Sequence, residues 1–129
     1  MWTSERSRVR PVGEAPAELG RVTLGGDPAG VTMGVERRWL PVYGPGGYCW
    51  RPTVDDKVLV LKTGDQGESP CILGKQQQLD ELQPGEVWLT GGESGILLGQ
   101  DKLELTGAVR INGQTLESII TEIVLELIG

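Results

Sequence analysis

The residue types that most often carry chemistry are sparse in this chain of 129 residues. It has no histidine, which removes the usual general base and the commonest ligand of transition metals. Its 18 carboxylates include the adjacent pairs Asp55-Asp56 and Asp80-Glu81, which lie beside turn signals and are expected to be solvated surface. We therefore expect no catalytic residue and no metal ligand, and we do not expect an enzyme.

Two glycine-rich segments and two cysteines also lack the pattern of a chemical site. Neither residues 44–47 nor Gly91-Gly92 has the spacing or the following lysine of a phosphate-binding loop. Cys49 and Cys71 form no CxxC pair, so the simplest expectation is two reduced thiols in or near strands. No cofactor is expected.

The elements that would position any site begin after an arm. Residues 1–20 lack apolar periodicity and are expected to form an N-terminal arm. From Arg21 to residue 78, short apolar runs alternate with Gly, Pro and Asp turns, and strands are expected near 22–24, 31–35, 37–42, 48–51, 57–62 and 70–74. This series favours a partly open Greek-key barrel.

A different pattern follows a polar connector at residues 79–86. Four aliphatic i, i+2 pairs succeed one another at short intervals: Val87/Leu89, Ile96/Leu98, Leu103/Leu105 and Val109/Ile111. Such short strands cannot bury an apolar face within one chain, whereas stacking them, or intertwining three copies, would make a continuous dry core. The short repeats and acidic outer positions favour a β-helical shaft over residues 87–114. Trp88, Leu97, Glu104 and Arg110 would point outward. The alternative is a plain antiparallel meander folded back on the barrel.

Residues 115–129 carry a third pattern, which predicts an amphipathic helix with Thr115 as its N-cap. Leu116 and Ile123 fall on heptad position d, and Ile120 and Leu127 on position a, a composition that favours three or four strands over two. A strand remains the alternative, because the segment is rich in β-branched residues.

Charge is distributed unevenly over these regions. The net charge is −6, and residues 79–129 hold nine acidic side chains against two basic ones. Such a surface repels phosphate backbones and anionic lipid headgroups, so no nucleic acid is expected as a partner. No run of about 18 apolar residues and no cleavable leader pattern occurs, so neither secretion nor stable membrane insertion is expected.

Five short motifs occur in a fixed order between Trp39 and Gly74. They are Trp39-Leu40-Pro41, Trp50-Arg51-Pro52, the run from Asp56 to Leu61, Gly64-Asp65, and Ile72-Leu73-Gly74. In order and spacing this stretch resembles the oligonucleotide/oligosaccharide-binding (OB) type domain of the phage baseplate spike family, baseplate assembly protein V. The resemblance covers residues 21–78 well, residues 85–113 moderately and both ends poorly.

The resemblance implies an all-β fold with a short C-terminal helix, in which an OB-like barrel precedes a trimeric intertwined β-helix shaft. It implies a structural central spike that docks on the baseplate hub and transmits force in envelope penetration. The barrel residues would be Trp39, Pro41, Trp50, Pro52, Val58, Val60 and Ile72. The shaft residues would be Val87, Leu89, Ile96, Leu98, Leu103, Leu105, Val109 and Ile111. The trimer helix would use Leu116, Ile120, Ile123 and Leu127.

The chain departs from the family at its tip. Many such spikes end in a His-x-His apex that is interpreted as holding iron, and this sequence has no histidine. The tip would instead be a blunt end, the helical bundle or a separate tip protein. The implied partners are two further copies of the chain and a hub protein. The chain would be made in the host cytoplasm and assembled in a phage tail baseplate or a phage-tail-like particle.

The alternative function is a binding module whose barrel face recognises an oligosaccharide or single-stranded nucleic acid. Such faces combine exposed aromatic rings with basic side chains. The chain offers Trp39, Tyr43, Tyr48, Trp50, Arg37, Arg38 and Arg51. Against this alternative, Pro41, Pro45 and Pro52 interrupt the segment, and the barrel region is nearly neutral.

Overall fold

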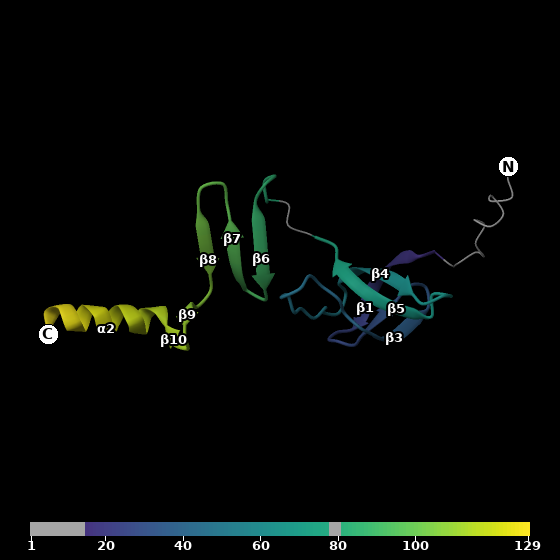
Figure 1. The fold of residues 1–129 in the computed structure, drawn as a ribbon, viewed down its shortest axis with the longest axis horizontal. Helices are drawn as coiled ribbons and strands as arrows, with labels where there is room; N and C mark the ends of the chain where they lie inside the picture. Colours follow the sequence, from purple (N-terminus) through teal and green to yellow (C-terminus); the bar gives the residue numbers. More distant parts are fainter. Residues whose placement is uncertain (1–14, 78–80) are drawn as a thin grey trace. The chain divides into compact units, whose positions relative to one another are not determined.

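The structure, a computed structural model, describes residues 15–77 and 81–129. The described chain is mostly β with one short helix at the C-terminus, which confirms the coarse fold prediction (Figure 1). It divides into two compact units, the N-terminal unit Met1–Gln78 and the C-terminal unit Leu79–Gly129.

The N-terminal unit contains a five-stranded antiparallel sheet in the order β3-β2-β1-β4-β5. Its strands are β1 (Ala17–Leu24), β2 (Ala29–Thr32), β3 (Glu36–Leu40), β4 (Lys57–Thr63) and β5 (Ser69–Lys75). β1 is the longest strand and pairs with β2 on one side and β4 on the other. The side chain of Val31 on β2 fills the space beside Gly20 of β1, since a Cβ atom at Gly20 would come within 2.3 Å of Val31 Cγ1.

The two edge strands of this sheet, β3 and β5, come together. The segment that follows β3 forms a parallel bridge between Val42 and Ile72 of β5. Ile72 N donates to Pro41 O at 2.9 Å, and Tyr43 N donates to Ile72 O at 2.8 Å. The backbone of Ile72 therefore pairs with the chain that leaves the opposite edge strand, and that edge is covered at this point.

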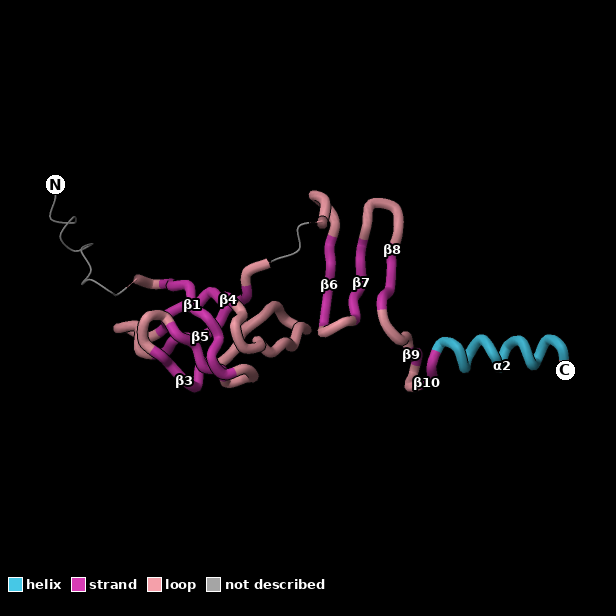
Figure 2. The backbone as a smooth tube through the Cα atoms, turned by 180° about the vertical axis from the view of Figure 1, so that it is seen from behind, coloured by secondary structure: helices cyan, strands magenta, loops and turns pink. Residues whose placement is uncertain are grey.

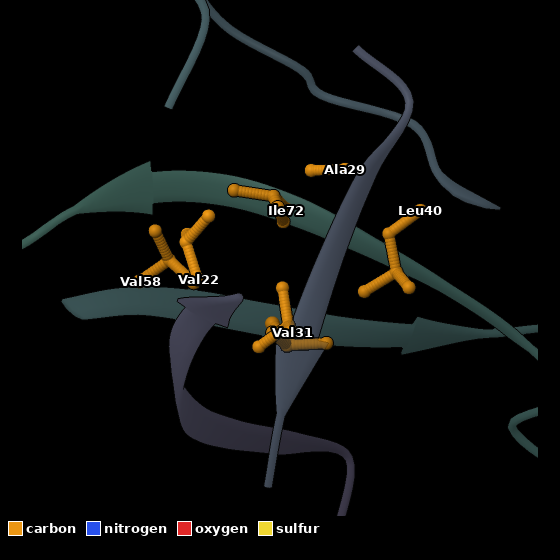
Figure 3. Close-up of a cluster of buried hydrophobic side chains, with 7 residues drawn as sticks. Val22, Ala29, Val31, Leu40, Val58 and Ile72 are labelled. Atoms are coloured by element: carbon orange, nitrogen blue, oxygen red, sulfur yellow. The ribbon is translucent and has the colours of Figure 1, made fainter. Parts of the chain in front are cut away.

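Aliphatic side chains from all five strands fill the interior of the N-terminal unit. Figure 3 shows six of them converging from different strands. The cluster consists of Val22, Ala29, Val31, Leu40, Val58, Val60 and Ile72, each 0–1% exposed. Trp50 packs against its edge. The alternation of side chains along a strand explains which residues belong to this cluster. On β4, Val58 and Val60 face inward, whereas Lys57 and Leu59 do not.

Several expected strand limits in this unit are wrong. β1 begins at Ala17, not Arg21, so residues 17–20 are strand rather than arm; residues 1–14 lie outside the described residues. β2 ends at Thr32, because Gly34 takes a φ of 87° and Met33 N bonds to Val35 O, which turns the chain. The alternation of residues 31–35 therefore spans a strand and a turn.

The expected strand at residues 48–51 is also wrong, because this segment is irregular. Tyr48 N donates to Pro45 O in a turn built on the Gly-rich loop, and Pro52 offers no N–H for a ladder. Trp50 is held by its indole Nε1, which donates to Tyr43 O at 3.0 Å. The ring, rather than the backbone, connects this segment to the sheet.

The C-terminal unit holds two small antiparallel sheets and the helix. Figure 2 shows β6, β7 and β8 side by side in magenta and the helix in cyan. β6 (Val87–Gly91), β7 (Ser94–Leu98) and β8 (Leu103–Thr106) form a meander, and β9 (Arg110–Ile111) and β10 (Gln114–Thr115) form a hairpin. The hairpin turns at Asn112-Gly113, both at positive φ, as a tight two-residue turn requires.

The helix α2 spans Leu116–Ile128, which settles the choice between helix and strand in favour of the helix. Thr115 is its N-cap, as predicted: the Thr115 hydroxyl accepts from Ser118 N at 3.1 Å. Leu116 N, another donor left open at a helix start, donates to Val109 O at 2.9 Å. The cap and the hairpin together fix where the helix begins.

Candidate functional site

The most distinctive surface of the described chain is one face of the β6–β8 meander. The register places Val87, Leu98 and Leu103 in one row across the three strands. It places Leu89, Ile96 and Leu105 in a second row, two residues along each strand and so on the same side of the sheet. We call these six side chains the aliphatic face. Three of the four pairs singled out from the sequence thus form one continuous patch.

The aliphatic face is not covered within the chain. Its six side chains, all Val, Ile or Leu, are 38–62% exposed, although exposing apolar surface to water is unfavourable. A contiguous exposed patch of this kind on a monomer marks an interaction site rather than an ordinary surface. Burying one such side chain fully contributes about 1.5–3 kcal/mol, so six of them represent a large unrealised stabilisation.

The opposite face of the same meander is better covered. Trp88 and Leu97 pair across the strands there and are half-buried. The Trp88 ring lies over Gly95, where a Cβ atom would come within 2.3 Å of Cη2, so a side chain at this position would displace the indole. Glu104 completes that row and is exposed. The face expected to point outward is therefore the one that the chain itself covers, and the aliphatic face is left open.

The fourth aliphatic pair, Val109/Ile111, does not lie on one strand: only Ile111 belongs to β9. Val109 precedes β9 and lines a hollow of about 440 Å³ together with Leu89, Ile96 and Leu105 of the aliphatic face. Ile111 lies on β9 opposite Gln114 and is exposed. Val109 thus extends the aliphatic face, whereas Ile111 belongs to the short hairpin that leads into α2.

The helix α2 has no buried residue. The four heptad residues expected to form a trimer seam are all exposed: Leu116, Ile120, Ile123 and Leu127. Glu117, Glu122 and Glu126 supply its charge, and its last turn has no basic residue. A 13-residue helix without packing is marginal in water, so its apolar stripe also requires a partner surface.

Five of the seven residues expected to hold the barrel are placed in or beside the interior of the N-terminal unit: Val58, Val60, Ile72 and Pro52 are buried, and Trp50 packs on the core. Pro41 is exposed and contributes the carbonyl that receives Ile72 N. Trp39 does not contribute to the core. Its side chain is 71% exposed, and its φ of 65° is a strained conformation that costs a bulky residue about 1–3 kcal/mol.

The aromatic and basic residues of the alternative binding function are only partly brought together. Arg37, Arg38, Trp39 and Tyr43 line one hollow of about 410 Å³. Glu68, which directly precedes β5, lines the same hollow, whereas Tyr48 and Arg51 do not. Arg51 Nη1 instead donates to the exposed Cys49 Sγ at 3.3 Å, while Cys71 is buried; both thiols are free.

A second apolar hollow of about 760 Å³ lies over β1, β4 and β5. Leu19, Met33, Leu59 and Leu73 form much of its lining, and Arg21, Lys57 and Lys75 contribute to it as well. Leu19, Leu59 and Leu73 are on the outer side of the sheet, since they alternate with inward residues of their strands, whereas Met33 packs against the core. This surface is a further candidate for coverage by another chain.

Two carboxylates of the N-terminal unit have altered acidity. Partial burial works to raise the pKa of Asp56, but hydrogen bonds from Thr53 N and Lys75 Nζ outweigh it and lower that pKa. The pKa of Glu68 is lowered because its carboxylate accepts hydrogen bonds from the backbone N–H groups of Glu68 and Gln66. Neither group is arranged as a proton donor at neutral pH.

Within residues 15–77 and 81–129, no three His, Cys, Asp or Glu side chains gather as metal ligands would. Among the same residues, no helix has the length and apolar content needed to cross a membrane. Comparison of the chain with protein-family models, with curated proteins and with solved structures gives no match.

Proposed function

We propose that this chain is the structural central spike of a contractile-tail baseplate, or of a related phage-tail-like particle, and that it works as a homotrimer. The aliphatic face carries the proposal. Six Val, Ile and Leu side chains on one side of a three-stranded meander stay 38–62% exposed in the single chain. Copies of the same chain are the simplest cover, because each brings an identical apolar face to a common axis.

Three-fold association fits the details of this unit. Three meanders that present their aliphatic faces to one axis would enclose a dry apolar core. The isoleucine-rich heptad of α2 favours three or four strands over two. Trp88 and Glu104, on the opposite side of each sheet, would then form the outer wall of a shaft with an acidic surface.

The N-terminal unit supports the same assignment. Its strand order β3-β2-β1-β4-β5, with the parallel bridge between Val42 and Ile72, is the connectivity expected of a five-stranded OB-type barrel. The motifs at Trp39, Trp50 and Ile72 that resemble the spike family lie in this unit. We assign it as the collar that docks on the hub protein.

The proposed mechanism is mechanical. Sheath contraction supplies the force, and the interlocked trimer transmits it without unfolding, since separating the chains would expose every aliphatic face at once. No step requires a proton donor, a nucleophile or a metal ion. The shaft would end in the α2 bundle or in a separate tip protein.

The assignment is tested on particles from cells that encode the chain. Contractile-tail particles are purified and labelled with gold-conjugated antibodies raised against the N-terminal unit. The proposal expects label at the baseplate end of the tail. Contractile particles that contain no copy of the chain by mass spectrometry, or that carry it only in the sheath, would contradict it.

A further inference from the structure

We propose that β1 binds an extended segment of another protein by β-strand addition, and that this segment is rich in aliphatic and acidic residues. The site is the open side of residues 17–20 together with the apolar hollow of about 760 Å³ beside it. We call it the β1 edge site. If the chain is the spike proposed above, the hub protein would supply the segment; only that identification rests on the proposed function.

The first half of β1 pairs on one side only. β4 pairs with β1 from Ala17 to Arg21. β2 ends at Thr32, which pairs with Arg21, because the chain then turns at residues 33–35. Among the described residues, no strand therefore pairs with residues 17–20 on the β2 side. A strand with one open side presents its backbone groups to any chain that can extend along it.

The ladder with β4 shows which backbone groups are open. The carbonyl of Pro16 accepts a hydrogen bond from β4, and the N–H of Val22 donates to the residue that precedes β4, each at 2.9 Å. Because hydrogen-bonded residues alternate in an antiparallel pair, the even-numbered residues of this stretch bond to β4. The N–H and C=O groups of Ala17 and Leu19 therefore point to the open side. They are the donors and acceptors that an added strand uses.

An apolar surface adjoins this open side. Leu19 of β1 lies directly opposite Leu59 of β4, and both are on the outer side of the sheet with Leu73 of β5. The three side chains are 76%, 39% and 46% exposed, respectively. Every second side chain of an added strand would lie on this same side. Aliphatic residues at those positions would cover the leucines and remove apolar surface from water.

The charges around the hollow favour an acidic segment. Arg21 and Lys57 are exposed and lie directly opposite each other on β1 and β4, where two like charges are unfavourable. Among the described residues, neither of them forms an ion pair. Lys75 also lines the hollow, although Asp56 pairs with it at 3.3 Å. No described residue that lines the hollow is acidic, so carboxylates of a partner would meet only positive charge there.

The same charges disfavour two other occupants. Residues 1–14, which precede β1 in the chain, hold three arginines against two glutamates. They would add positive charge to a site that is already positive. A second copy that paired through its own β1 would bring the same cations together. An acidic segment of a different protein is the occupant that the charges fit.

The binding test uses the full chain and two synthetic octapeptides, which alternate valine with glutamate or valine with lysine. In isothermal titration, the glutamate peptide should bind with a dissociation constant below about 1 mM and at least about tenfold more tightly than the lysine peptide. Its affinity should fall at least about threefold between about 50 and 300 mM salt, because the cations are exposed.

The net charge of −6 would by itself produce the opposite preference between the peptides, so the glutamate preference points to the local cations. Failure of the glutamate peptide to bind, or a preference for the lysine peptide, would overturn the proposal.

Amide hydrogen exchange followed by NMR shows whether the peptide adds as a strand. The amides of Ala17 and Leu19 should exchange rapidly in the free chain and at least about tenfold more slowly with the glutamate peptide bound. Those of Glu18 and Gly20 should be protected in both states, since they bond to β4. Binding without this alternation would contradict strand addition. Protection in the free chain that is lost when residues 1–14 are deleted would assign the edge to the chain itself and overturn the partner.

Two variants locate the site. Leu19→Pro removes an open N–H but no bond to β4, so it should fold and bind the glutamate peptide at least about tenfold more weakly. Leu19→Val keeps the N–H and an aliphatic side chain and is its control. Arg21→Glu/Lys57→Glu should reverse the preference to the lysine peptide, whereas Arg37→Glu/Arg38→Glu, outside the hollow, should not. Unchanged binding in either site variant, or an equal effect in the Arg37/Arg38 control, would show that the peptide binds elsewhere.

The β1 edge site and the trimer fail separately, because the site is argued from residues of the N-terminal unit alone. A trimer that binds no glutamate peptide would remove the edge site and leave the spike. A monomer whose β1 binds the peptide would remove the spike and leave the edge site, with its partner no longer assigned to a hub.

Discussion

The two units of this chain differ in how far they bury their apolar side chains. The N-terminal unit buries seven aliphatic side chains to 0–1% exposure and covers its sheet edge by the pairing of Ile72. Among the described residues of the C-terminal unit, none is buried, although Val, Ile and Leu recur throughout it. The first unit encloses a core within a single chain, and the second leaves its apolar side chains exposed.

The difference arises from strand length and layering. β1 spans eight residues and pairs on both sides, and all five strands of its sheet contribute side chains to one core. The strands of the C-terminal meander span four or five residues and form one layer. A single layer with one apolar face needs a second layer. We infer that further copies of the chain provide it.

The largest expected effect is the double substitution Leu103→Asp/Leu105→Asp on the aliphatic face. In a trimer these positions face the axis, and each buried, unpaired carboxylate costs several kcal/mol. Assembly should be lost at micromolar concentration, as measured by sedimentation velocity. In a monomer the same positions are half exposed, and the substitution would have little effect.

The matched control for this experiment is Glu104→Lys, which lies between the two leucines but on the opposite side of β8. It should leave the oligomer mass and the melting temperature nearly unchanged. If the double substitution leaves a trimer of unchanged melting temperature, the aliphatic face does not line an intersubunit core.

The next largest effect tests the other unit. Ile72→Ala should destabilise the N-terminal unit by about 2–5 kcal/mol, because Ile72 is fully buried in its core. Urea denaturation measures this loss, and Ile72→Val, at about 0.5–1.5 kcal/mol, is the graded control. Oligomer mass should not change. Dissociation of the oligomer by Ile72→Ala would show that assembly depends on the core of the N-terminal unit.

A smaller effect is expected at the start of α2. Thr115→Ala removes the acceptor of Ser118 N and should cost about 1 kcal/mol in the C-terminal unit, whereas Thr115→Ser should retain the cap. Thermal unfolding followed by circular dichroism at 222 nm measures the difference. An equal loss in both variants would mean that the hydroxyl does not cap the helix.

The smallest effect concerns pH and the N-terminal unit. The pKa of Asp56 is lower in the folded state, so its contribution is present above the unfolded value of about 3.9 and lost as pH falls through the folded value. Asp56→Asn should cost at most about 1 kcal/mol at pH 7. The difference from the parent, measured by urea denaturation, should shrink below pH 4. A difference that stays constant from pH 7 to 3 would refute this assignment.

Local patterns predicted much of this structure. The alternation around Val58 and Val60 identifies their inward faces, because every second residue of a strand points the same way. Thr115 could be identified as the N-cap because a hydroxyl directly precedes a helical apolar period. Three of the four aliphatic pairs lie on one face for the same reason as Val58 and Val60.

What sequence patterns did not predict depends on distant contacts or on single dihedral angles. The parallel bridge between Val42 and Ile72 joins residues thirty positions apart, and no local signal specifies it. The resemblance placed Trp39 among the residues that hold the barrel, but Trp39 has a φ of 65° and its side chain is 71% exposed. Alternation also cannot distinguish strand pairing within a chain from pairing between chains. It therefore did not predict that β6, β7 and β8 pair with one another in a single chain.

The central claim is that the aliphatic face closes against two further copies of the chain. Sedimentation equilibrium of the purified full-length protein, at protein concentrations from 1 to 50 μM, tests it most directly. The account predicts one species with the mass of three chains of 13.9 kDa across this range. A monomer throughout the range would contradict the trimer and, with it, the assignment of the chain as a spike.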